Sequence, residues 1–176
     1  MEILIDAILV VLFSIIIYQD FRYRGITWYL IPLIFIALII KGLQVVDWKE
    51  QMNYFFLNTG IVLIQIAGVS LYFSIKNKRF INIINQHLGI GDVLILLVLC
   101  LCFSPPNFVL FLSVTLLVTL LFSIAGIYIF GNKHIHVPLA GYLAVYFNIL
   151  LVFQMIFKEF SLYNNHYIEN WLFKLI

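Results

Sequence analysis

The chain has 176 residues, of which 64% are hydrophobic and only 10% are charged. A soluble domain is roughly 45–50% apolar and about 25% charged, so this composition excludes an ordinary soluble protein. The net charge of +2 is too small and too dispersed along the chain for a nucleic-acid-binding protein. The apolar residues form long blocks of roughly the 20 residues that a helix needs to cross a bilayer. They predict an all-α, multi-pass membrane protein.

Six membrane-spanning helices are predicted, and together they make one membrane domain over residues 1–157. Gly25 is well placed to end the first as a C-cap, and Trp28 and Tyr29 suit the interfacial aromatic belt at the start of the second. Pro105 and Pro106 follow the fourth. The predicted spans are 3–22, 28–46, 53–75, 90–104, 107–130 and 137–157, the last opening at Pro138.

Two further segments have simpler expectations. The tail, 158–176, mixes aromatic and charged residues and predicts an amphipathic helix lying on the membrane surface. Cys100 and Cys102 lie two residues apart within the fourth predicted span. They are expected to point to different faces of that helix and to pack as apolar side chains, without a local disulfide or metal site.

The loop charges predict the orientation of the chain. Cytosolic loops of membrane proteins carry an excess of Lys and Arg. The segments after the first, third and fifth spans hold six basic residues, against four on the other side: Arg22, Arg24, Lys76, Lys78, Arg79 and Lys133, against Lys41, Lys49, Lys158 and Lys174. The N-terminus is therefore expected to face outward, with these three loops in the cytosol.

Two aspartates are expected to meet at the inner face. Asp20 lies at the inner end of the first span and Asp92 at the inner start of the fourth, with two complete spans between them. Both carboxylates therefore reach the same side of the membrane. A third acid, Asp6, lies about 21 Å along the first span from Asp20 and cannot join them.

A pair of carboxylates at a membrane interface predicts aspartic peptidase chemistry. Like charges a few ångströms apart do not both ionise readily, so the pair shares one proton. The ionised member can then act as general base on a water while the protonated member polarises a carbonyl. Gly89 and Gly91, just before Asp92, would let the chain stay extended and a substrate backbone approach closely.

Each candidate residue also has a simpler interpretation. Asp20 could form an ion pair with Arg24, four residues further along the helix, and the role of Asp92 could be limited to capping the fourth helix. His87 could tune Asp92 or contact substrate, although a solvated loop histidine explains it equally well. A metal site at His134 and His136 is a minor alternative, and neither a metal nor another cofactor is expected.

Three stretches resemble the type IV prepilin peptidases and archaeal preflagellin peptidases, membrane aspartyl proteases of the GxGD type. They are "YQDFRYRGI" at the end of the first span, "GIGDVLIL" at the start of the fourth and "HVPLAGYLA" entering the sixth. The resemblance implies that Asp20 and Asp92 are the catalytic pair. It further implies pilin-like or flagellin-like precursors as partners and a position in the cytoplasmic membrane. The leader would be removed on the cytosolic side.

The chain departs from the family pattern at a few positions. Many bacterial members have Ile-Pro after the first aspartate, where this chain has Ile26 and Thr27. Many carry a lysine two residues after the GxGD aspartate, where this chain has Leu94. The cytosolic methyltransferase segment of the larger bacterial enzymes has no counterpart, so the resemblance implies a protease-only form. These differences bear on substrate preference and leave both aspartates in place.

Two other functions remain open from the sequence. A small carrier or assembly subunit could use the same intramembrane acids to relay protons or ions. An inactive homologue could serve as a scaffold. Arg24, His87 and Pro138 are the candidate auxiliary residues of the peptidase.

Overall fold

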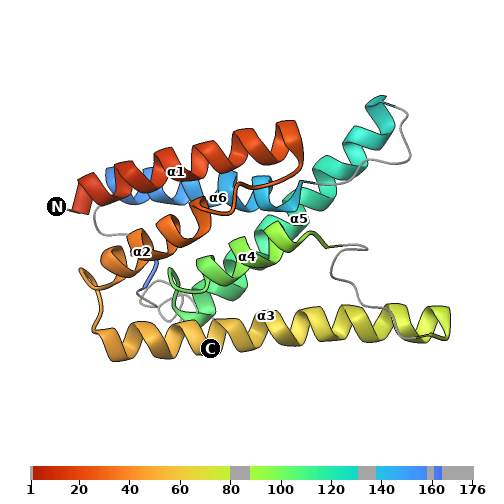
Figure 1. The fold of residues 1–176 in the computed structure, drawn as a ribbon, viewed down its shortest axis with the longest axis horizontal. Coiled ribbons are helices and arrows are strands. Elements are labelled where there is room, and N and C mark those ends of the chain that lie inside the picture. Colours follow the sequence, from red (N-terminus) through yellow and green to blue (C-terminus); the bar gives the residue numbers. More distant parts are fainter. Residues whose placement is uncertain (1, 80–87, 131–137, 158–160, 164–176) are drawn as a thin grey trace, which may run out of the picture.

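A computed structural model describes residues 2–79, 88–130, 138–157 and 161–163 (Figure 1). These residues form an all-α bundle of six helices and contain no β-strand, which confirms the predicted fold class. Four of the helices, α1, α3, α5 and α6, are long and apolar enough to cross a membrane. The helices are α1 (Glu2–Tyr23), α2 (Leu30–Gly42), α3 (Trp48–Asn77), α4 (Ile90–Leu99), α5 (Pro105–Phe130) and α6 (Leu139–Ile156).

Helices α2 and α4 are shorter than the spans predicted over 28–46 and 90–104. With 13 and 10 residues they extend about 20 and about 15 Å, less than the roughly 30 Å of a hydrocarbon core. The chain stays apolar beyond each helix, so hydropathy does not mark where the helix ends. Past α4 the amides of Leu101 and Cys102 bond to carbonyls three residues back, which closes the helix in tight turns.

Two buried polar side chains of α3 donate hydrogen bonds to backbone carbonyls in α2 and just past α4. Asn58 is fully buried, and its Nδ2 donates to the carbonyls of Cys100 (3.0 Å) and Phe103 (2.8 Å). Gln51, also fully buried, donates to the carbonyl of Leu38 at 3.3 Å. A backbone carbonyl without a partner is costly in an apolar interior, so the two bonds from Asn58 allow α4 to end there. Asn58 thus links α3 to the segment where α4 ends.

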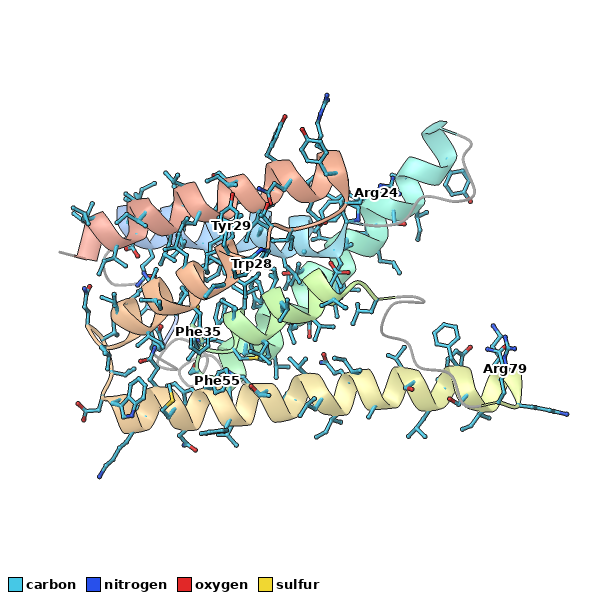
Figure 2. All side chains as sticks on the ribbon, viewed as in Figure 1. Arg24, Trp28, Tyr29, Phe35, Phe55 and Arg79 are labelled. Carbon is cyan, nitrogen blue, oxygen red and sulfur yellow. The ribbon has the colours of Figure 1, made fainter. Side chains whose placement is uncertain are left out.

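The core lies where α1 packs against α6 along its length (Figure 1). Phe13 of α1 packs against Phe147 of α6 with ring centroids 4.7 Å apart and ring planes tilted by 57°, and Phe103, just past α4, adds a third ring 5.8 Å from Phe147. Helix α3 runs along the far side of the bundle and packs against α4 and α5. Figure 2 shows Phe35 of α2 and Phe55 of α3 directed toward each other, with ring centroids 6.3 Å apart.

Helix α1 ends at Tyr23 and Arg24 is its C-cap residue, so the C-cap predicted at Gly25 is wrong by one residue. Arg24 has φ of 53°, in the left-handed region, and its amide bonds to the carbonyl of Asp20 at 3.0 Å. Lys78 ends α3 in the same way, with φ of 51°. Both left-handed residues are basic, and a cation at a helix C-terminus is stabilised by the helix dipole.

The interfacial helix predicted over 158–176 lies outside the described residues except for 161–163. Those three residues pack into the bundle, where Leu162 and Tyr163 are buried. The Leu162 carbonyl accepts bonds from the amide of Ser104 (3.2 Å) and from Asn107 Nδ2 (2.9 Å). This part of the tail is therefore anchored to the start of α5.

Candidate active site

The first turn of α6 holds both candidate aspartates. Gly141 donates its amide to Asp20 Oδ2 at 2.5 Å, and Ala140 donates its amide to Asp92 Oδ1 at 2.8 Å. These amides belong to consecutive residues, whose Cα atoms are about 3.8 Å apart. The structure therefore brings Asp20 and Asp92 together at the first turn of α6, as the sequence predicts, and α6 supplies the two amide donors that bind them.

Asp20 reaches α6 from the last turn of α1 and is 6% exposed. The absence of a side chain at Gly141 makes room for it. A Cβ built on Gly141 would lie 3.0 Å from Asp20 Oδ2 and 2.8 Å from the ring of Phe21. Within the described part of the chain, Asp20 Oδ1 has no hydrogen-bond partner, so this oxygen can accept or donate a bond to a water or a substrate.

Asp92 combines the capping role with the contact to α6. It stands at the third position of α4, and its Oδ2 accepts the amide of Gly89, the N-cap residue, at 3.1 Å. Gly89 is extended, as predicted, and a Cβ there would lie 3.1 Å from the Asp92 carboxylate. The simpler interpretation of Asp92 as a helix cap is thus correct for one oxygen, while the other oxygen bonds to Ala140.

Gly91 differs from its predicted role. It was expected to keep the chain extended, but α4 begins at Ile90 and Gly91 lies in the first turn of the helix. A Cβ at Gly91 would approach Ile26 Cδ1 to 3.3 Å. The missing side chain therefore lets the loop between α1 and α2 pack against the start of α4.

Arg24 does not form the ion pair with Asp20 that the simpler interpretation of Asp20 requires. Among the described residues, the one ion pair joins Lys41 of α2 to Asp6 of α1, and both side chains are buried. Arg24 acts on Asp20 only as a nearby positive charge, and Figure 2 places it beyond the end of α1. Asp6 stays apart from the two aspartates, as predicted: it lies near the opposite end of α1, where it pairs with Lys41.

The electrostatic setting favours one shared negative charge at the pair. Amides at the N-terminus of a helix carry a partial positive charge that stabilises an anion. The charges of Asp20 and Asp92 also act on each other, which opposes ionisation of both at once. Asp92 is half-buried, and Gly89 and Ile90 beside it are exposed.

The remaining candidates are placed only in part. Pro138 is the N-cap residue of α6, and its carbonyl accepts the amide of Tyr142 at 3.1 Å. Pro138 therefore stands two residues before Ala140, whose amide and that of Gly141 bond to the two aspartates. His87, His134 and His136 lie outside the described residues. Within the described ranges, no group of three His, Cys, Asp or Glu side chains could hold a metal ion.

Sequence reasoning missed Ala140, Gly141 and Ile26. Their contributions are backbone amides and a packing contact, which no side-chain pattern reveals. The available signal was a proline followed by small residues in "PLAG", which marks a helix start that other groups can approach closely.

Comparisons with known proteins add no further assignment. No protein-family model, no curated protein and no solved structure matches the chain.

Proposed function

We propose that the protein is a membrane-embedded aspartyl endopeptidase that removes the short basic leader of pilin-like or flagellin-like precursors. The observation that carries the proposal is the binding of Asp20 and Asp92 to the successive amides of Gly141 and Ala140. Two carboxylates from helices distant in sequence, fixed together at one helix terminus, suit acid–base hydrolysis of a peptide bond.

The reaction needs one proton on the pair. The ionised carboxylate takes a proton from a water, whose oxygen forms a bond to the carbon of the scissile carbonyl. The protonated carboxyl donates its proton to the carbonyl oxygen, giving a neutral tetrahedral intermediate. The intermediate then collapses: the C–N bond breaks and the nitrogen takes a proton from the protonated carboxyl. One hydroxyl of the intermediate returns its proton to the ionised carboxylate as it becomes the new carbonyl, and the products are a carboxylic acid and an amine. The pair again carries one proton.

The substrate class and the side of the membrane follow from the sequence. The three stretches around Asp20, Asp92 and Pro138 resemble the prepilin peptidase family, whose substrates carry a basic leader before a hydrophobic helix. Loop charges favour a cytosolic position for the pair in the cell membrane. The burial of Lys41 in an ion pair with Asp6 strengthens this bias, since only three basic residues then remain on the outer side.

The structure makes the carrier function less favourable. A proton or ion moving between Asp20 and the buried pair of Asp6 and Lys41 would travel along α1 for about 21 Å. The buried side chains of α1 over that distance are all apolar: Leu9, Leu12, Phe13 and Ile16. A relay needs polar side chains or water at intervals along its path, and the buried face of α1 offers none. The polar pair of Ser14 and Asn148 lies on the less buried side of α1.

The test is cleavage of a candidate precursor co-expressed with the protein and followed by gel shift. We expect Asp20→Asn and Asp92→Asn to remove nearly all cleavage while the protein still inserts in the membrane. Asp47→Asn is the matched control, because Asp47 is exposed and its side chain makes no capping bond to α3. Cleavage should persist in strong chelators. Near wild-type cleavage by either dyad variant, or loss of turnover in chelator restored by zinc, would overturn the proposal.

A further inference from the structure

A short loop connects α1, which carries Asp20, to α2, and one side chain of α1 holds this loop. Gln19, next to Asp20, is partly buried, and its Oε1 accepts two hydrogen bonds from Thr27. The Thr27 amide donates at 2.9 Å and the Thr27 hydroxyl at 2.8 Å. Both donors require an acceptor, which fixes the orientation of the Gln19 amide group.

The loop in turn contacts the start of α4. Ile26, the residue before Thr27, packs on Gly91, where a Cβ would come within 3.3 Å of its side chain. Gly91 immediately precedes Asp92. A continuous set of contacts therefore runs from Gln19, beside the first aspartate, through Thr27 and Ile26 to the residue beside the second.

These contacts constrain the position of α4, which carries Asp92, whereas α6 binds only the carboxylate oxygens. The amides of Ala140 and Gly141 fix the carboxylate oxygens, but α4 is a short helix of 10 residues. The segment before it, 80–87, lies outside the described residues. Among the described contacts, Ile26 is the side chain from the α1–α2 loop that meets the first turn of α4. The direction in which α4 presents Asp92 therefore depends on where the loop is held.

We propose that Gln19 is a positioning residue for the aspartate pair. By holding Thr27, it presses Ile26 onto Gly91 and sets the approach of Asp92 to Asp20. The inference rests on the proposed peptidase function for its kinetic consequence, although the contact itself can be measured without catalysis. A displacement of about 1 Å at a reacting group can lower the rate about 100-fold.

The kinetic test is a graded series at the two residues. Thr27→Ser keeps both donors and should retain kcat. Thr27→Val keeps only the amide and should lower kcat a few-fold. Gln19→Met keeps the length, removes the acceptor and should lower kcat about 10- to 100-fold, with KM changed less than about 3-fold. In the Gln19→Met background, Thr27→Val should add no further loss, because the bond it weakens is already absent.

A second measurement reports the loop position directly. Ile26→Cys should react slowly with a maleimide in the otherwise wild-type protein and several-fold faster when combined with Gln19→Met. Trp28→Cys is the matched control, because Trp28 is 78% exposed and its labelling should be equal in both backgrounds. The native cysteines, Cys100 and Cys102, are fully buried and give little background.

The outcomes separate the two proposals. Absence of precursor cleavage by the wild-type protein would refute the proposed peptidase function. The labelling result would still show whether Gln19 holds the loop. Wild-type kcat in Gln19→Met, or equal labelling of Ile26→Cys in both backgrounds, would overturn the positioning role. Should Gln19→Met fail to fold, the difference between Thr27→Ser and Thr27→Val decides the matter: equal kcat values would refute the proposal.

Discussion

The carboxylate of Asp20 lies where a side chain at residue 141 would begin. Gly141 donates its amide to Asp20 Oδ2, and a Cβ on the same residue would stand 3.0 Å from that oxygen. The contact joins residues 121 apart in the chain. The close approach of α1 to the N-terminus of α6 therefore depends on a glycine at this position.

Gly141→Ala is predicted to impair cleavage more than folding. The new methyl group would displace the Asp20 carboxylate or the ring of Phe21, which is 47% exposed and has room to move. We expect kcat to fall about 10- to 100-fold and the free energy of unfolding to change by about 1 kcal/mol or less. Alanine is itself a better helix former than glycine, which offsets part of the crowding.

The control for this variant is Gly60→Ala in α3, where a Cβ meets nothing within 4 Å. It should leave cleavage unchanged. Equal activity of Gly141→Ala and Gly60→Ala in the gel-shift assay would show that the space at Gly141 is not needed for catalysis.

Asn58→Leu is predicted to destabilise the bundle. The buried amide of Asn58 serves the carbonyls of Cys100 and Phe103, and leucine would leave both without this donor. We expect a loss of about 1–3 kcal/mol in the free energy of unfolding, measured by detergent titration followed by circular dichroism. Gln65→Leu is the comparison, because Gln65 lies exposed on the same helix and should tolerate the change. Equal stability of the two variants would contradict a capping role for Asn58.

The buried pair of Asp6 and Lys41 is predicted to behave non-additively. Removing one partner leaves a buried charge without its counter-ion, so Asp6→Leu and Lys41→Met should each cost about 3–5 kcal/mol. The double variant removes both charges and should recover most of the loss. Additive losses in the same unfolding assay would show that the two side chains do not stabilise each other.

The sequence predicted the long helices better than the short ones. In lipid every backbone group needs a partner within its own segment, so an uninterrupted apolar block such as 107–130 is read correctly as a helix. The same reasoning fails at 90–104, because Asn58, more than 40 residues away, satisfies the carbonyls where α4 stops. Long-range side-chain caps of this kind leave no mark in local hydropathy.

The sequence predicted the two aspartates of the candidate site but not the backbone amides and packing contacts that hold them. Counting predicted spans put Asp20 and Asp92 on one side, and the structure brings them together at α6. The amide of Gly141 and the packing of Ile26 on Gly91 depend on how three helices dock. Gln19 reads in the sequence as one more polar residue beside Asp20, and only the folded loop shows that it holds Thr27.

The membrane orientation gives a prediction that is independent of catalysis. Arg79 stands exposed just past the end of α3, and Trp48 stands half-exposed at its start (Figure 2 labels Arg79). We expect an impermeant maleimide to label Trp48→Cys in intact cells and Arg79→Cys only after the inner face is opened. Labelling of Arg79→Cys from outside would reverse the topology and place the aspartate pair on the other side of the membrane.

Asp20 and Asp92 are predicted to act as a unit, because one shared proton gives each carboxyl a role that needs the other. The double variant Asp20→Asn/Asp92→Asn should then be scarcely slower than either single variant, since groups that work together are strongly non-additive. The pH profile of cleavage should be bell-shaped. At low pH both carboxyls are protonated and no base remains, while at high pH both are ionised and no acid remains. The two limbs belong to the pair and to neither residue alone. Losses that multiply in the double variant, or a profile with a single limb, would contradict a shared proton between the carboxylates that α6 holds on adjacent amides.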